Sequence, residues 1–412
     1  MIMEKQTHSP EGDFCGERKE DFDMQVYADQ AATTKISERA LQAMLPCYTE
    51  YFGNPSSLHD AGRSAGEVME KARKRIASAI GAEAGEIYFT SGGSEADNWA
   101  ITQAAYMGAQ KGKKHLISSA FEHHAVLHVL DRLAKEGFEV TLLPVHEDGL
   151  VRTEELEAAI RKDTALVTIM FVNNEVGTVQ PIQKIGEICR KKGVLFHTDA
   201  VQAVGHLNID VKDLKVDFLS MSGHKFHGPK GVGALFIRKG ISFRGMILGG
   251  GQEKKLRAGT ENVPAIAGMA EALCESLEER AQKDEKVHAM RRQLLEGILE
   301  IPGTRLNGDP ERRLPGNINV SFEGVEGEAM LLYLDLHGIC VSSGSACTAG
   351  SVEPSHVLTA MGIPANIAHG ALRISIDETN TEEEVEYILE TLPEVIERLR
   401  SLSPGWECSG CL

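Results

Sequence analysis

Residues 194–225, VLFHTDAVQAVGHLNIDVKDLKVDFLSMSGHK, contain two short apolar runs, each followed by polar residues. The first run, Val194–Thr198, leads to Asp199, and the second, Phe218–Ser222, leads through a glycine and a histidine to Lys225. Short apolar runs bounded by polar residues predict buried strands of a parallel sheet. Ligands bind such sheets outside the carboxyl ends of the strands, so we expect Asp199 and Lys225 to face one crevice. Asp199 is equally typical of a residue that caps the following turn.

The same pattern extends along most of the chain. Seven strands are predicted, at Ile87–Thr90, His115–Ser118, Glu139–Leu143, Ala165–Val172, Val194–Thr198, Phe218–Ser222 and Ala234–Ile237. Helical patterns lie between them at Glu95–Ala109, Ala125–Glu136, Glu154–Ile160 and Ile182–Lys191. Strands that alternate with helices predict an α/β fold, with a mostly parallel sheet covered by helices on both faces.

The pattern changes beyond about residue 265. A long charged helical pattern, Ala267–Glu300, leads away from the sheet, and three strand candidates follow it, at Asn317–Phe322, Gly338–Val341 and Ala371–Ile376. A final helix is predicted to open with a capping box at Thr381 and to be interrupted at Pro393.

We therefore divide the chain into three parts. Residues 1–23 are polar and acidic and are predicted to be a disordered extension. Residues 24–265 would form the large domain, and residues 266–412 a smaller C-terminal α/β domain. The first residues of the large domain are expected to pack against the small domain.

Composition limits the classes of function. The formal net charge of −17 argues against a general affinity for nucleic acid or anionic membranes. We find no apolar run near the ~20 residues that span a bilayer, and no secretory signal, so we expect a cytoplasmic protein. The eight cysteines are widely spaced, which does not suggest a disulfide framework. Cys408 and Cys411 form a lone CxxC that could bind metal, but a metal site needs more ligands, so we predict none.

Residues 88–95, YFTSGGSE, combine a strand, a glycine turn and a helix start. The free N–H groups at such a helix start can bind phosphate, although many glycine turns bind nothing. A phosphate site followed by a strand-end carboxylate and a strand-end lysine fits pyridoxal phosphate. Its aldehyde forms a Schiff base with a lysine, here Lys225, and its ring nitrogen needs a carboxylate, here Asp199.

A second candidate reactive group is Cys347. It lies in residues 341–350, VSSGSACTAG, among small residues that are typical of a loop. Cys340, in contrast, lies between Ile339 and Val341 and is predicted to fill space in the core. We expect the Cys347 thiol to be accessible.

From about Tyr27 to Trp406 the chain resembles the cysteine desulfurases of the NifS/IscS type, which are class V aminotransferases of the fold-type I pyridoxal-phosphate enzymes. The matching motifs are ADQAATT (28–34), GNPSS (53–57), EH (122–123), VNNE (172–175), SGHK (222–225), GPKG (228–231) and SSGSACT (342–348). The last motif is typical of the group whose nucleophilic cysteine lies in a long loop. The chain departs from the usual pattern at Gln30, Lys35 and Gly93-Ser94, and has Ile376-Asp377 where Leu-Gly is commoner.

The resemblance implies a homodimer that binds pyridoxal phosphate and L-cysteine. Lys225 would bind the cofactor aldehyde, Asp199 the ring nitrogen and Gln202 the ring hydroxyl. His123 would stack on the ring and exchange protons with the thiol. The implied cofactor-binding positions are Gly93, Ser94, His123, Asn174, Asp199, Gln202, Ser222, His224, Lys225 and Thr260, the last from the partner subunit. Asn174 and Arg373 would hold the substrate carboxylate.

Plainer interpretations exist for two of these residues. His123 and His124 could be a surface pair at a helix start, and Arg373 could face solvent on an alternating strand.

The resemblance implies that L-cysteine is converted to L-alanine while its sulfur moves to Cys347 as a persulfide. The sulfur would then pass to an iron–sulfur scaffold or another sulfur-acceptor protein, which the sequence does not identify. A selenocysteine lyase or another class V aminotransferase would share Lys225, Asp199 and His123, and an aminotransferase would not need Cys347. A third alternative is a non-catalytic assembly scaffold, but Lys225, Asp199 and Cys347 would then have no role.

Overall fold

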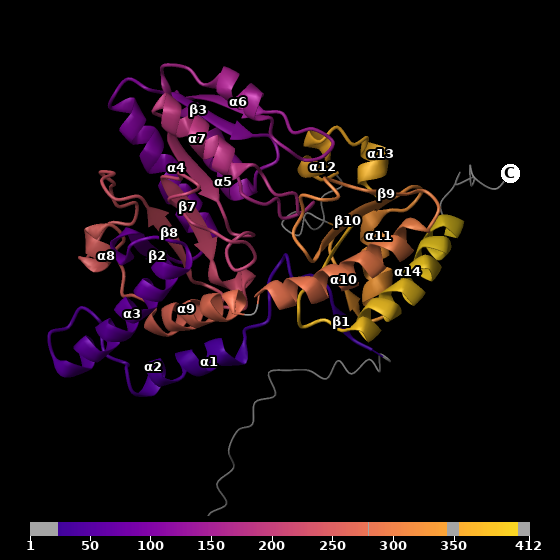
Figure 1. The fold of residues 1–412 in the computed structure, drawn as a ribbon, viewed down its shortest axis with the longest axis horizontal. Coiled ribbons are helices and arrows are strands. Elements are labelled where there is room, and N and C mark those ends of the chain that lie inside the picture. Colours follow the sequence, from indigo (N-terminus) through magenta and orange to yellow (C-terminus); the bar gives the residue numbers. More distant parts are fainter. Residues whose placement is uncertain (1–23, 279, 344–353, 403–412) are drawn as a thin grey trace, which may run out of the picture.

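The computed structural model describes residues 24–278, 280–343 and 354–402, and Figure 1 shows them as two lobes. The large lobe is drawn in indigo to salmon and the small lobe in orange and yellow. Three sequence predictions lie outside the described residues: the disordered extension 1–23, the accessible thiol of Cys347, and the CxxC of Cys408 and Cys411. Among the described helices, none is both long and apolar enough to cross a membrane.

A seven-stranded sheet forms the centre of the large lobe. Its strands, in spatial order, are β2 (Ile87–Thr90), β8 (Gly233–Ile237), β7 (Phe218–Ser222), β6 (Leu195–Asp199), β5 (Thr164–Thr168), β3 (His115–Ser119) and β4 (Glu139–Leu143). β8 runs antiparallel to both neighbours, and the other adjacent pairs are parallel. The prediction of a mostly parallel α/β sheet is therefore confirmed, although β5 ends at Thr168, four residues earlier than expected.

Alternation along the strands divides the core between the two faces of this sheet. One face packs on α4 (Gly93–Ala109) and α5 (His124–Lys135) through residues that include Leu116, Leu166 and Phe218. The next residue on each strand, Ile117, Val167 and Leu219, packs into the opposite core. That core is completed by α3 (Asp60–Ala79), α6 (Thr153–Ala159), α7 (Ile182–Lys192) and α9 (Val263–Leu277).

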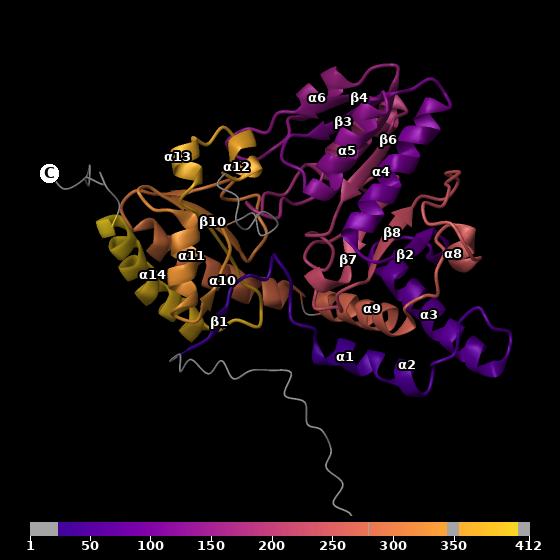
Figure 2. The ribbon, with the colours of Figure 1, turned by 180° about the vertical axis from the view of Figure 1, so that it is seen from behind.

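The small lobe is built on a three-stranded antiparallel sheet in the order β12 (Ala371–Ser375), β10 (Asn317–Phe322) and β9 (Thr304–Leu306). Its core also contains residues of α10 (Arg280–Leu299), α11 (Gly327–Asp335) and α14 (Glu382–Leu402). β1 (Val26–Tyr27) pairs in parallel with β11 (Ile339–Cys340), so the described part of the chain begins in this lobe before it crosses to the large one, as Figure 2 shows.

The remaining elements are short. They are α1 (Glu38–Met44), α2 (Pro46–Thr49), η1 (Ala84–Glu86), η2 (Gly223–Lys225), α8 (Gln252–Lys255), α12 (His356–Ala360) and α13 (Ala365–Ala368). Of these, η2 matters most for the site because it directly follows β7 and contains Lys225.

The prediction of one long helix over Ala267–Glu300 is wrong. Glu278 ends α9 in an extended conformation, with φ −70° and ψ 134°, and α10 starts at Arg280. α9 packs against α1 and α3 in the large lobe, whereas α10 packs against α14 in the small lobe. The two helices therefore bury their apolar faces in different cores, which a continuous periodicity does not reveal.

The predicted interruption at Pro393 is also wrong, because α14 continues through it to Leu402. A proline inside a helix costs roughly 3 kcal/mol. Buried side chains on both sides of it, Ile388, Leu392, Val395 and Ile396, offset that cost at about 1.5–3 kcal/mol each. The capping box is confirmed: Glu384 N donates to Thr381 Oγ1 (3.2 Å), and Thr381 N donates to Glu384 Oε2 (3.1 Å).

Candidate active site

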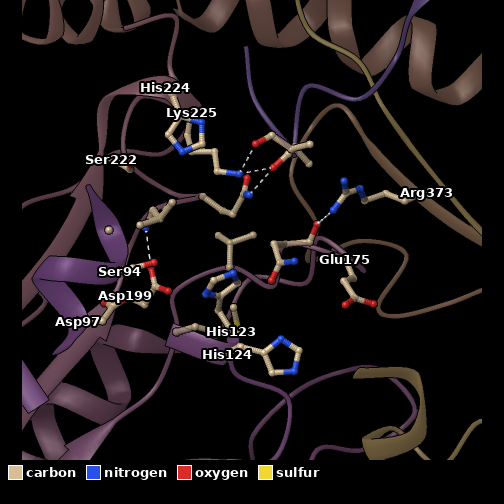
Figure 3. A pocket seen from close by; sticks show the side chains of 18 of the residues that line it. Ser94, Asp97, His123, His124, Glu175, Asp199, Ser222, His224, Lys225 and Arg373 are labelled. Atoms are coloured by element: carbon tan, nitrogen blue, oxygen red, sulfur yellow. Dashed lines mark hydrogen bonds between the residues drawn. The ribbon is translucent and has the colours of Figure 1, made fainter. Parts of the chain in front are cut away.

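A cavity of about 250 Å³ lies where the carboxyl ends of β6 and β7 meet the small lobe. Figure 3 shows Lys225, Asp199 and Arg373 on different sides of it. Ten of the predicted site residues line this cavity: Gly93, Ser94, His123, Asn174, Asp199, Gln202, Ser222, His224, Lys225 and Arg373. Thr260 does not; it is exposed in the segment between α8 and α9.

Lys225 reaches the cavity from η2. Its Nζ donates to two backbone carbonyls of the N-terminal segment, Ala31 O (2.5 Å) and Ala32 O (2.8 Å). Gln202 Nε2 donates to the same Ala31 carbonyl (2.9 Å). The backbone of Lys225 is also in contact, because His206 Nε2 lies 2.8 Å from the Lys225 carbonyl oxygen. The backbone of Lys225 is thus held by His206 of the large lobe, and its amine by the N-terminal segment. That segment also hydrogen-bonds to β12, because Ala31 N donates to Ser375 Oγ (2.9 Å).

Asp199 ends β6 with its carboxylate buried. Its Oδ1 accepts a hydrogen bond from Val201 N (2.9 Å), so the residue does cap the following turn, as the plainer interpretation held. The residue also lines the cavity, so capping does not exclude a role there. Burial, reinforced by the nearby Asp97 carboxylate, raises the pKa of Asp199 to about 7.

The start of α4 forms another side of the cavity. Its N-cap, Gly92, has φ +156° and no side chain that could cap the first N–H groups. Ser94, Ser222 and His224 lie around this helix start. A Cβ on Gly93 would lie 2.4 Å from Val201 Cγ2, so glycine permits the close approach of the two segments. An uncapped start of a 17-residue helix beside two hydroxyl groups suits an anion such as phosphate.

His123 is the N-cap of α5, as expected for a helix start, but its side chain lines the cavity. Its Nδ1 accepts a hydrogen bond from Ala125 N (3.1 Å), and this assigns the proton of the neutral ring to Nε2. Burial, followed by the positive charge of Lys225, lowers the pKa of His123 to about 4.

Arg373 enters the cavity from the small lobe. The alternative in which it faces solvent is wrong, because all five residues of β12 are buried and Arg373 is only 1% exposed. Its Nη1 donates to Asn174 O (2.9 Å), and its Nη2 donates to Asp29 Oδ1 (2.7 Å). Asp29 was not predicted as a site residue, although it lies in the ADQAATT motif.

Comparison with known proteins agrees with this geometry. The family model of the class-V aminotransferases matches residues 26–388. The chain belongs to that family. It is 53% identical over 379 residues to a cysteine desulfurase IscS of Methanosarcina thermophila, covering 92% of this chain and 94% of the relative.

Solved structures agree with this assignment. A NifS-like protein superposes with a TM-score of 0.86 at 42% identity, covering 91% of this chain and all of the other. A structure titled SspA in complex with cysteine superposes with a TM-score of 0.75 at 38% identity, covering 85% of this chain and 98% of the other.

Beside the cavity lies a buried polar network that the sequence did not reveal. His197 Nε2 lies 3.0 Å from Ser220 Oγ and 3.5 Å from Asp97 Oδ1, and its Nδ1 lies 2.8 Å from Thr168 Oγ1. Burial raises the pKa of Asp97 to about 7 and lowers that of His197 to about 4. The spacing of these residues could have indicated the network. Asp97 follows Gly93 by one helical turn, and His197 precedes Asp199 by two residues on one strand, so each lies on the same face as a predicted site residue.

Proposed function

We propose that this chain is a cysteine desulfurase that converts L-cysteine to L-alanine with pyridoxal phosphate and transfers the sulfur to Cys347. One observation supports this above the others. Lys225, Asp199 and the uncapped start of α4 surround a single cavity, into which Arg373 projects from the other lobe. Relatives named cysteine desulfurase match nearly the whole chain, which supports the same reaction.

The residues fit the cofactor. The start of α4, with Ser94, Ser222 and His224, would hold the phosphate, while Asp199 would pair with the ring nitrogen. When bound, pyridoxal phosphate supplies an aldehyde and an electron-poor ring that stabilises negative charge at the substrate Cα. Lys225 Nζ would hold the aldehyde until the amino group of L-cysteine replaces it, and as a free amine it would then remove the substrate's Cα proton.

Arg373 would bind the substrate carboxylate through its guanidinium group, together with Asn174. Its bonds to Asp29 and to the Asn174 carbonyl fix the guanidinium group in advance, which lowers the entropic cost of binding. His123, with its proton on Nε2, would donate that proton within the cavity.

Cys347 would act as a thiolate, because the thiol itself is a poor nucleophile. It would attack the sulfur of L-cysteine, so that an S–S bond forms as the Cβ–S bond breaks and the carbon fragment leaves as L-alanine after protonation. The persulfide sulfur would then pass to an iron–sulfur scaffold or another acceptor protein. Thr260, exposed here, would complete the phosphate site of a partner subunit in a homodimer.

The direct test compares the purified protein with its Cys347→Ser variant. We expect the protein to release sulfide and alanine in equal amounts from L-cysteine plus a reductant. The variant should release neither while it keeps the cofactor absorbance. Cys340→Ser is the matched control, because Cys340 lies in β11 and should be dispensable. Full product formation by Cys347→Ser, or transamination without sulfide, would instead indicate another class-V aminotransferase activity.

A further inference from the structure

A contact between the lobes joins the segment of Lys225 to the strand of Arg373. His227 follows Lys225 by two residues, and Asp377 follows Arg373 by four. His227 Nε2 and Asp377 Oδ2 lie 3.3 Å apart, and their side chains are only 13% and 6% exposed. Asp377 is one of the positions at which the chain departs from the pattern of the family it resembles.

The acceptor groups around the His227 ring favour its charged form. Its Nδ1 lies 3.0 Å from Lys35 O, an acceptor, and its Nε2 faces the Asp377 carboxylate, also an acceptor. A neutral imidazole has one N–H group and satisfies one of them, whereas an imidazolium satisfies both. The arrangement therefore favours a positively charged His227.

Both partners are held in place by further hydrogen bonds. His227 has a left-handed backbone, with φ +62°, and its N–H donates to Thr34 Oγ1 (2.8 Å). Asp377 Oδ1 accepts from Thr379 N (2.8 Å) and from Thr379 Oγ1 (2.5 Å), which leaves Oδ2 directed at the ring. The pair thus links two fixed elements.

The nearby charges favour the ion pair. Desolvation alone would lower the pKa of His227, but the hydrogen bond and charge of Asp377, with help from Glu378, raise it. Glu378 itself lies 3.5 Å from Lys283 Nζ on α10. His206 of the large lobe also faces the His227–Asp377 pair, and burial lowers the pKa of His206. Asp284 of α10 is a further charged neighbour of His206 and Glu378.

We propose that His227 and Asp377 form a positioning ion pair between the lobes. It holds the segment of Lys225 against the strand of Arg373, and so sets the distance between the cofactor-binding lysine and the arginine that holds the substrate carboxylate. The kinetic part of this proposal rests on the proposed function.

The pair should stabilise the protein over a defined pH range. Because the pKa of His227 is raised in the folded state, its contribution is complete below the ordinary value of 6.5 and is lost as pH rises through the folded value. The pKa of Asp377 is lowered, so its contribution is complete above 3.8 and is lost as pH falls through its folded value. The ion pair is therefore strongest in mildly acidic to neutral solution.

The test is Asp377→Asn, with Glu378→Gln as the matched control that removes one negative charge from the same turn. At neutral pH we expect Asp377→Asn to raise KM for L-cysteine about three- to tenfold, with kcat changed less than about twofold. Its melting temperature should fall most near pH 6 and approach that of the unsubstituted protein near pH 9. Glu378→Gln should change KM less than about twofold.

Three results would overturn the proposal. A loss of melting temperature that is equal across this pH range would mean that His227 is not charged. An unchanged KM with a lowered melting temperature would make the pair structural only. If EDTA abolished the difference in melting temperature between Asp377→Asn and the unsubstituted protein, a divalent cation would bridge His227 and Asp377. The melting temperature can be measured without enzyme activity. If Asp377→Asn showed the expected pH dependence of melting but the unsubstituted protein released no sulfide, only the proposed function would be contradicted.

Discussion

The cavity has two walls that are built differently. The sheet wall consists of Asp97, Asp199, Ser222 and Lys225, which come from neighbouring strands and the helix packed on them. The arginine wall consists of Arg373 and Asn174, with Asp29 bonded to Arg373 outside the cavity lining, and it forms only where the small lobe meets the large one. The sheet-wall residues themselves all come from one lobe, although the Lys225 amine also contacts the segment that crosses between the lobes, whereas the arginine wall depends on how the two lobes sit together.

The walls also differ in charge. In the sheet wall, burial raises the pKa of both Asp97 and Asp199 to about 7, so their charged forms are disfavoured. In the arginine wall, the guanidinium group of Arg373 forms an ion pair with the Asp29 carboxylate at 2.7 Å. We infer that the sheet wall serves the cofactor and the chemical step, and the arginine wall serves substrate binding.

The largest expected effect is that of Lys225→Ala in the sheet wall. Sulfide release should fall by about 10³-fold or more, because no other amine is predicted to bind the cofactor aldehyde or take the Cα proton. Lys212→Ala is the matched control, since Lys212 is an exposed lysine between β6 and β7 that does not line the cavity. Assays of both variants, with absorbance spectra, check this. Retained activity in Lys225→Ala would remove the sheet wall from the chemistry.

A change to the arginine wall should act on binding instead. In Arg373→Lys the charge remains, but the planar group that pairs with a carboxylate through two hydrogen bonds is lost. We expect KM for L-cysteine to rise about 10- to 100-fold, with a much smaller change in kcat. Steady-state kinetics measure the two separately. A 10- to 100-fold fall in kcat at unchanged KM would mean that the arginine wall acts in the chemical step, and would contradict the division of roles between the two walls.

The sequence predicts the sheet wall better than the arginine wall for a physical reason. Strand-end residues such as Asp199 and Lys225 are recognisable because local alternation and turns define where each strand ends. The Arg373–Asp29 pair joins residues 344 positions apart, and no local pattern specifies such a contact. The break at Glu278 is hidden for the same reason, since only packing decides that α9 and α10 belong to different cores.

Asp97 shows an intermediate case. Its position one turn after Gly93 places it towards the β6 and β7 ends, but its pairing with His197 needs the register of a strand 100 positions away. Asp97 was therefore not predicted: helical spacing from Gly93 indicates only its direction, while its partners and its protonation state depend on packing and burial.

The smallest effect, and the one that isolates the sheet wall, is a pH-dependent gain of stability in Asp97→Asn. The pKa of Asp97 is about 7 in the folded protein and 3.8 unfolded. As pH rises between these values, the unfolded chain releases its proton first, so the folded state loses stability. Asparagine has no proton to release. Relative to the unsubstituted apoprotein, the variant should therefore gain roughly 1–3 kcal/mol between about pH 5 and pH 8.

Melting of the cofactor-free proteins at the two pH values measures this gain, whatever constant cost the substitution adds. Asp131→Asn is the control, because Asp131 is exposed on α5 and should show the same difference from the unsubstituted protein at both pH values. KM for L-cysteine should stay within about twofold in Asp97→Asn, since the arginine wall is untouched. An equal melting difference at both pH values would mean that Asp97 ionises as freely as a surface carboxylate, and that burial does not set the charge of the sheet wall.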